Sequence, residues 1–178
     1  MIAQHLKASL LLSMSLVAAC ATHSIRPESS AAPPQLRKSS AAYVVVPEDG
    51  RYYEDKPYVG SGRMTAVAFS DALRNYVESV SLGPRPKDGF QSLQVVGTSV
   101  ATYVFLPEIL HWEDRSTEWS GRPDRIEIQV TVIEASTGKP LNQTIITGRS
   151  SWFTLGGDHP QEMLAGSVGE YIATLFGD

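Results

Sequence analysis

The stretch RIEIQVTV, at residues 125–132, indicates the fold class of this 178-residue chain. Apolar and polar side chains alternate along it, and successive side chains of a strand point to opposite faces of a sheet. One predicted face carries four branched apolar residues, Ile126, Ile128, Val130 and Val132. The pattern therefore predicts a strand of an antiparallel sheet that packs on one face and meets water on the other.

The residues after this stretch predict a hairpin and then a helix. The segment EASTGKP turns the chain, with Gly138 available for a positive φ, and residues 141–151 return as the partner strand. A helix is expected after Asp158 as its N-cap, with Pro160 in the first turn and Gly177 beyond the end. Its buried stripe is predicted to contain Leu164, Val168, Tyr171, Ile172 and Leu175.

The residues before the stretch predict further strands and helices. A strand is expected at 43–48, a helix at 63–80, a short helix at 90–99 and a strand at about 102–113. Pro107 implies a bulge or an unpaired edge position in the last of these. The stripe of the first helix contains Ala66, Phe69, Leu73, Tyr76, Val77 and Val80. The order β-α-α-β-β-β-α predicts an α+β two-layer sandwich, a mainly antiparallel sheet with helices on one face.

The first twenty residues resemble a bacterial lipoprotein signal. After Lys7, an apolar core too short to span a bilayer leads into Val17-Ala18-Ala19-Cys20, which resembles a lipobox. We predict a signal peptide at 1–19 and a lipid on Cys20. An ordinary signal peptide cut at Ala-x-Ala is the alternative. Residues 20–42 are rich in Ser, Ala and Pro, so we expect a flexible tether there and one folded domain at 43–178.

Composition narrows the location and the partners. Cys20 is the only cysteine, so the chain forms no intramolecular disulfide. Ala21 stands where an aspartate would resemble an inner-membrane retention signal, so we expect the outer membrane, on its periplasmic face. Without the signal and its Lys7, the net charge changes from −4 to about −5, which argues against nucleic acid as a partner and against adhesion to anionic lipid headgroups.

Residues 111–125, HWEDRSTEWSGRPDR, contain the densest group of functional side-chain types. One histidine, His111, with loosely spaced carboxylates lacks the ligand spacing of a zinc site, and His159 is too distant in sequence to be assumed nearby. We therefore expect no metal, and no cofactor other than the lipid on Cys20. A nucleophile is not indicated either, because no G-x-S-x-G elbow is present.

A glycosidase site and an anion site are two further possibilities, and each competes with a simple structural role. Glu113, Asp114 or Glu118 could act as acid and base in a glycosidase, but the neighbouring arginines favour ionised, ion-paired carboxylates. Gly60-Ser61-Gly62 could bind an anion at the start of a helix, but it lacks the third glycine of the dinucleotide fingerprint. A helix-entry loop explains those glycines more simply.

Two segments carry a resemblance to a known family. They are YVFLPEILHWEDRSTEWSGRPDRIEIQVTVIEASTGKPL, from residue 103, and SSWFTLGGDHPQEML, from residue 150. They resemble an uncharacterised family of bacterial lipoproteins, domain of unknown function 4823. The resemblance implies a lipoprotein with an unknown partner and a fold like the N-terminal domain of the Tol-system propeller protein. It also implies that Glu134 is the acid of a D-x-x-T-G-like hairpin, and it brings no catalytic residues.

The hypothesis that follows is a non-enzymatic, lipid-anchored module that binds an envelope protein or a glycan. A long connection between strands with tryptophan and arginine is typical of a contact surface. The predicted binding residues are Trp112, Arg115, Trp119, Arg122 and Arg125. In the competing interpretation, Trp112 folds under the loop and Trp119 stacks on an arginine. The alternatives in function are a periplasmic glycan hydrolase that uses the 111–125 carboxylates, or a subunit that pairs through an exposed edge strand at Pro107.

Overall fold

The structure is a computed structural model, and it describes residues 22–28, 34–51, 57–91, 93, 100–114, 123–150 and 159–178. Within these ranges the chain forms two helices and a six-stranded sheet. The elements are β1 (Thr22–Pro27), β2 (Ala41–Val45), α1 (Ser61–Leu73), β3 (Ser79–Gly83), β4 (Tyr103–Glu113), β5 (Arg125–Glu134), β6 (Pro140–Arg149) and α2 (Pro160–Phe176). None of the helices in these ranges is long and apolar enough to cross a bilayer.

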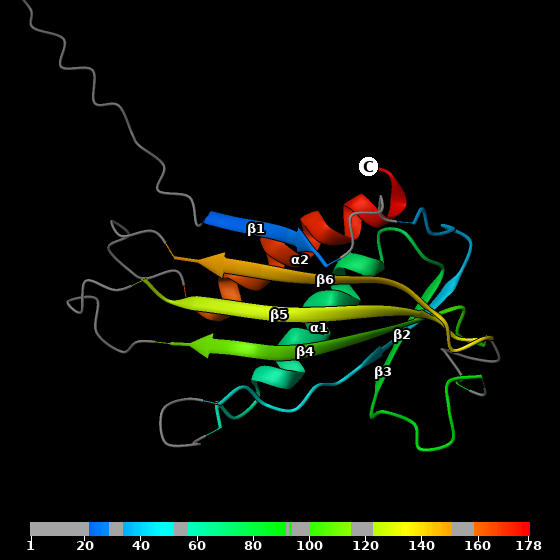
Figure 1. The fold of residues 1–178 in the computed structure, drawn as a ribbon, viewed down its shortest axis with the longest axis horizontal. Coiled ribbons are helices and arrows are strands. Elements are labelled where there is room, and N and C mark those ends of the chain that lie inside the picture. Colours follow the sequence, from blue (N-terminus) through cyan, green and yellow to red (C-terminus); the bar gives the residue numbers. More distant parts are fainter. Residues whose placement is uncertain are drawn as a thin grey trace, which may run out of the picture.

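The strand order in the sheet is β1-β6-β5-β4-β2-β3, and both helices pack on the same face of it (Figure 1). The pairs β1–β6, β6–β5 and β5–β4 are antiparallel, whereas β2 is parallel to both β4 and β3. Helix α1 connects the parallel strands β2 and β3 as a crossover. The predicted α+β sandwich, with a mainly antiparallel sheet and helices on one face, is confirmed.

The alternating stretch forms β5 as predicted. Its four branched apolar residues are fully buried under the helices, while the polar residues between them keep partial exposure. Gly138 takes φ 71° in the turn to β6, a left-handed conformation that favours glycine. The Thr137 hydroxyl donates to Glu134 at 2.7 Å, which fastens the turn locally.

The main core lies between the sheet and the helices. Phe69 of α1 meets Phe105 of β4 and Tyr171 of α2, with ring centroids 6.4 Å and 6.5 Å apart. Tyr171 is only 1% exposed, and its hydroxyl donates to Asn142 at 2.8 Å. Burial raises the pKa of the Tyr171 hydroxyl well above its usual range. Each helix therefore fixes the other against the centre of the sheet.

The first helix is shorter than its apolar spacing predicts. It ends at Leu73, and Val80 lies in strand β3, which pairs with β2. Tyr76 stacks on Phe176 at 4.8 Å. The prediction of a helix to residue 80 is wrong because Val77 and Val80 are buried equally well beyond a helix end, so spacing alone does not locate the boundary. The second helix has His159 as its N-cap, one residue after the predicted Asp158.

The predicted tether is partly built into the domain. Thr22–Pro27 forms edge strand β1, and the buried Leu36 donates its N–H to the carbonyl of Leu175 at 2.7 Å. The expectation of a flexible segment over 20–42 does not hold for these residues. An edge strand gains its hydrogen bonds from the backbone of β6, so a segment with a single apolar contact residue, Ile25, can still be ordered.

The face of the sheet away from the helices is not exposed to solvent along its whole length. At the β2 end a second buried cluster covers it, formed by Ala41, Tyr43, Val45, Ala101, Val104, Ile133 and Ala135, with Phe90, Leu93 and Leu106 packed against them. Phe90 and Gln91 lie in a bend and a turn. Residues 92 and 94–99, most of the predicted short helix, are outside the described ranges.

Strand β4 has one free side along its second half. Its pairing with β2 stops at Phe105, while its pairing with β5 continues to Glu113. On the side away from β5, Pro107 therefore has no partner strand within the described sheet, which is the edge position predicted. The bulge in β4 lies between Ile109 and His111, two residues further along.

Candidate functional site

Four strands bring one terminus each to the same end of the sheet, which we call the site end. The register places Glu113 opposite Arg125, Arg125 opposite Arg149, and Arg149 opposite Thr22. Figure 1 shows β1 starting where β4 and β6 finish and where β5 begins. The site end is thus a row of four residues, Glu113, Arg125, Arg149 and Thr22.

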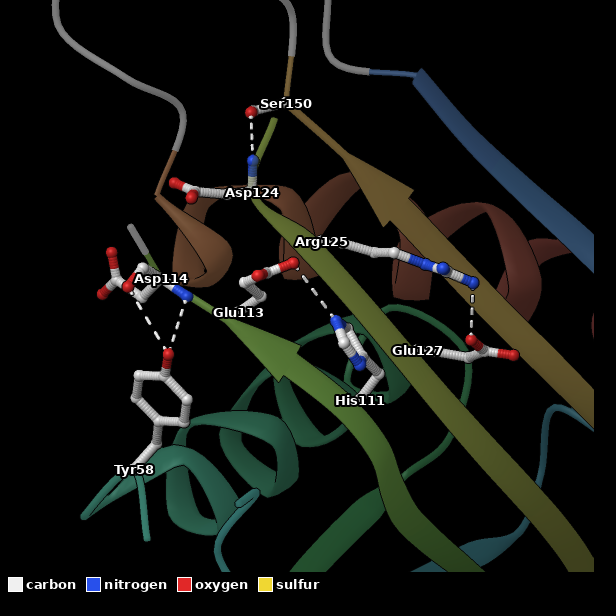
Figure 2. Close-up of polar contacts among 8 residues, drawn as sticks. All are labelled: Tyr58, His111, Glu113, Asp114, Asp124, Arg125, Glu127 and Ser150. Atoms are coloured by element: carbon white, nitrogen blue, oxygen red, sulfur yellow. Dashed lines mark hydrogen bonds and ion pairs between the residues drawn. The ribbon is translucent and has the colours of Figure 1, made fainter. Parts of the chain in front are cut away.

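The face away from the helices carries a charged group at the site end. The His111 imidazole lies 3.4 Å from the Glu113 carboxylate, and the Arg125 guanidinium donates to Glu127 at 2.8 Å (Figure 2). The Glu113 side chain is 11% exposed, whereas that of Arg125 is 44% exposed. In each pair the two residues are two positions apart on one strand, so the pleat alone places their side chains next to each other on the same face.

Trp112 points the other way, into the core. It is 2% exposed and belongs to the cluster between sheet and helices. A Cβ on Gly50 would lie 2.8 Å from the Cβ of Trp112, so Gly50 leaves the space in which the indole sits. The prediction of Trp112 as a contact residue is wrong, and the competing interpretation of a core tryptophan holds. Alternation explains it, because Trp112 stands between His111 and Glu113 on the opposite face.

A second polar group lies on the helix side of the site end. Tyr58, just before α1, accepts from the Asp114 N–H at 3.2 Å and donates to the Asp114 carbonyl at 3.4 Å (Figure 2). The His159 imidazole, at the start of α2, lies 3.4 Å from the Asp114 carboxylate. These contacts tie the end of β4 to the starts of both helices.

Asp124 joins this group from the residue before β5. It is 8% exposed, its N–H donates to the Ser150 hydroxyl at 2.8 Å, and its carbonyl accepts from the Ser150 N–H at 3.1 Å. One ligand atom each from Asp114, Asp124 and His159 lie within 4.8 Å of one another. One imidazole and two carboxylates are ligands that divalent cations such as Zn²⁺ accept, with a position left for water. Sequence reasoning missed Asp124 and discounted His159, since only the topology brings them together.

Several predicted site residues are outside the described ranges. They are Cys20, Arg115, Glu118, Trp119 and Arg122. Of the predicted binding residues, the structure therefore places only the buried Trp112 and the exposed Arg125.

The glycines before α1 bind a carboxylate from the chain itself. Asp49 accepts from the N–H groups of Gly60 at 3.0 Å and Gly62 at 2.8 Å. The Ser61 hydroxyl accepts from the Gly50 N–H at 2.8 Å. A Cβ on Gly62 would collide with the Pro47 carbonyl. The loop is therefore a helix entry held by an internal anion, which leaves the helix N-terminus occupied.

The described part of the structure also contains two grooves. One, of about 510 Å³, runs between the helices and is lined by apolar side chains such as Met64 and Val67 of α1 and Leu164 of α2. The other, of about 660 Å³, follows the free side of β4 past Pro107 and Ile109. The second groove is the accessible edge that the predicted edge-strand pairing would use.

Comparisons with known proteins concern the family and the fold. The model of the family described as Domain of unknown function (DUF4823) matches residues 34–175. The fold is similar to the PelC dodecamer from Paraburkholderia phytofirmans, with TM-score 0.63 and 14% identity, over 86% of this chain and 97% of that chain. It is also similar to a DUF330 protein from Xanthomonas campestris, with TM-score 0.50 and 13% identity, over 82% of this chain and 86% of that one. No curated protein matches. The expected likeness to the Tol-system propeller domain stays a prediction.

Proposed function

Since this chain belongs to the family described as Domain of unknown function (DUF4823), we propose that it is a lipid-anchored envelope protein without catalytic activity. Cys20 carries the lipid, and the outer membrane holds the chain on its periplasmic face. The folded domain binds another envelope component, a protein or a glycan. No metal and no cofactor besides the lipid take part, and nucleic acid is not a partner.

The observation that supports a non-catalytic role is the separation of the two neighbouring carboxylates. Glu113 lies on the open face of the sheet beside His111, whereas Asp114 lies on the helix side beside Tyr58 and His159 (Figure 2). A glycosidase needs two carboxylates that flank one bond, about 5 to 9.5 Å apart in a shared cleft. Here the Glu113 carboxylate lies beside His111, whereas the Asp114 carboxylate lies beside His159 at the start of α2. Each of them makes structural contacts instead.

The proposed contact surface is the 111–125 connection, now without Trp112. Arg125 contributes an exposed guanidinium at its end, and Arg115, Trp119 and Arg122 complete the set. Tryptophan and arginine are the residue types that contribute most at binding hot spots.

Cross-linking in intact cells, read by mass spectrometry, tests this surface. The native protein is compared with a Trp119→Ala, Arg122→Ala double variant, and with Arg63→Ala, Arg74→Ala, which removes two exposed arginines at α1, as the control. We expect a partner that the native protein and the control capture and that the first variant loses. Capture of the same partner by all three would keep a binding role and reject this surface.

A second candidate function is hydrolysis of a cell-wall or surface glycan, with carboxylates of the 111–125 segment as acid and base. The grouping of Asp114, Asp124 and His159 within 4.8 Å favours it. It predicts turnover of glycan by the purified protein and loss of turnover in Asp124→Asn. Absence of turnover in the native protein would remove this candidate.

A further inference from the structure

We infer that the site end of the sheet rests on the membrane that holds the Cys20 lipid, with Arg125 and Arg149 facing lipid phosphates. The inference depends on the proposed lipidation of Cys20. It names the surface that the anchor holds against the bilayer, in place of the flexible tether expected over residues 20–42. Arg125 also belongs to the proposed contact surface, so an envelope component that binds there would meet it at the membrane.

The first step is the distance between the anchor and the sheet. Strand β1 begins at Thr22, only two residues after Cys20. A chain spans at most about 3.5 Å per residue, so the Cα of Cys20 lies within roughly 7 Å of the Cα of Thr22. The six register pairs of β1 with β6 fix Thr22 to the rest of the sheet. No length of chain remains that would let the domain move away from the lipid.

The second step is the row of residues beside Thr22. Neighbouring strands lie about 4.8 Å apart, which puts Arg149 about 5 Å, Arg125 about 10 Å and Glu113 about 15 Å from Thr22. The turn between β5 and β6 is at the opposite end of the strands. Residue 139 directly precedes β6 and is eight positions from residue 147 within it, which is roughly 27 Å at 3.4 Å per residue. The site end is therefore the end that the anchor holds nearest to the bilayer.

The third step is the chemistry of the two arginines. Arg125 and Arg149 are direct register partners, so their side chains leave the same face of the sheet. Both are exposed. Arg125 pairs with Glu127 at 2.8 Å, whereas Arg149 makes no ion pair with any other residue that the structure describes. Like charges directly opposite each other destabilise a strand pair. A phosphate between two guanidinium groups converts that repulsion into charge-assisted hydrogen bonds, which is the recognition that arginine favours.

The test measures how close two points on the same strand lie to the lipid. The full chain is produced with its signal, purified in detergent and reconstituted into phosphatidylethanolamine–phosphatidylglycerol vesicles. Because Cys20 is the only cysteine and its thiol carries the lipid, a single new cysteine takes the fluorophore. Thr147→Cys reports the site end and Lys139→Cys reports the hairpin end. Quenching by lipids with a nitroxide headgroup is compared between them.

We expect about threefold or more quenching at position 147 relative to 139, given the roughly 27 Å between them. Equal quenching in an anchored protein would overturn the inference and leave the proposed function intact. It would mean that the domain lies on its side. A chain that stays out of the membrane fraction and lacks the lipid mass on Cys20 would overturn both.

The phosphate contact has its own matched control. Arg125→Gln, Arg149→Gln removes the paired arginines, and Arg63→Gln, Arg74→Gln removes two exposed arginines at α1. We expect the first variant to lose at least half of the difference between positions 147 and 139, and the second to keep it. Equal losses in both variants, or none in either, would reject the role of the arginine pair.

Discussion

Replacement of Asp49 by alanine removes the internal anion from the start of α1. The carboxylate accepts two backbone N–H bonds, at 3.0 Å and 2.8 Å, and faces the positive end of the helix. Hydrogen bonds to a charged group contribute about 1.5 to 3 kcal/mol each. Both bonds are only partly buried, so water can replace part of the loss. We therefore expect a decrease in the free energy of unfolding of about 2 to 3 kcal/mol.

The assay is urea and thermal unfolding of the protein without its lipid, followed by circular dichroism. A loss of that size lowers the thermal midpoint by roughly 4 to 12 °C in a domain of this length. Asp71→Ala is the matched control, since Asp71 is an exposed aspartate of α1 and its carboxylate pairs with Arg74. It should change stability by no more than about 0.5 kcal/mol. If Asp49→Ala and Asp71→Ala cost the same, the assignment of Asp49 as the capping anion is refuted.

Four further substitutions test the packing. Gly166→Ala and Gly169→Ala should each raise the free energy of unfolding by about 1 kcal/mol, because a Cβ at either position meets nothing within 4 Å; a decrease in urea midpoint would contradict this. Trp112→Ala should lower stability by about 3 to 5 kcal/mol, as for a buried aromatic side chain, whereas a loss under 1 kcal/mol would show that the indole is not in the core. Because burial raises the pKa of Tyr171, its stabilising contribution is complete below pH 10 and is lost as the pH rises further. Above pH 10, the free energy of unfolding should therefore fall less steeply with pH in Tyr171→Phe than in the native protein, by up to about 1.4 kcal/mol per pH unit. An unchanged slope would reject the assigned burial of the hydroxyl.

The elements that the sequence predicts best are those whose signal is local. Strand β5 follows from strict alternation, and the turn at Gly138 follows from one residue that tolerates a positive φ. The end of α1 cannot be predicted from a local signal, because Val80 fits a helical stripe and strand β3 equally well. Strand β1 is also missed, since it pairs with the distant strand β6 and its own sequence carries little apolar signal.

In the candidate site, too, local contacts could be predicted from the sequence and long-range contacts could not. The contacts of His111 with Glu113 and of Arg125 with Glu127 are two residues apart and could be anticipated from the pleat. The grouping of Asp124 with His159 depends on where β5 and α2 begin in space, and no local pattern reports that. Trp112 was assigned by residue type, and its direction was decided by alternation.

The pairing of β1 with β6 also has a consequence for the order of events during maturation. Thr22 finds its partner in Arg149, near the other end of the chain, so β1 cannot dock until the β5–β6 hairpin has been synthesised and folded. Pairings between distant segments form late, because loop closure must precede them. Under the proposed lipidation of Cys20, that interval leaves β1 unpaired and within reach of the processing enzymes. Docking of β1 onto β6 then ends this access, although β1 precedes β6 in the chain and is synthesised first.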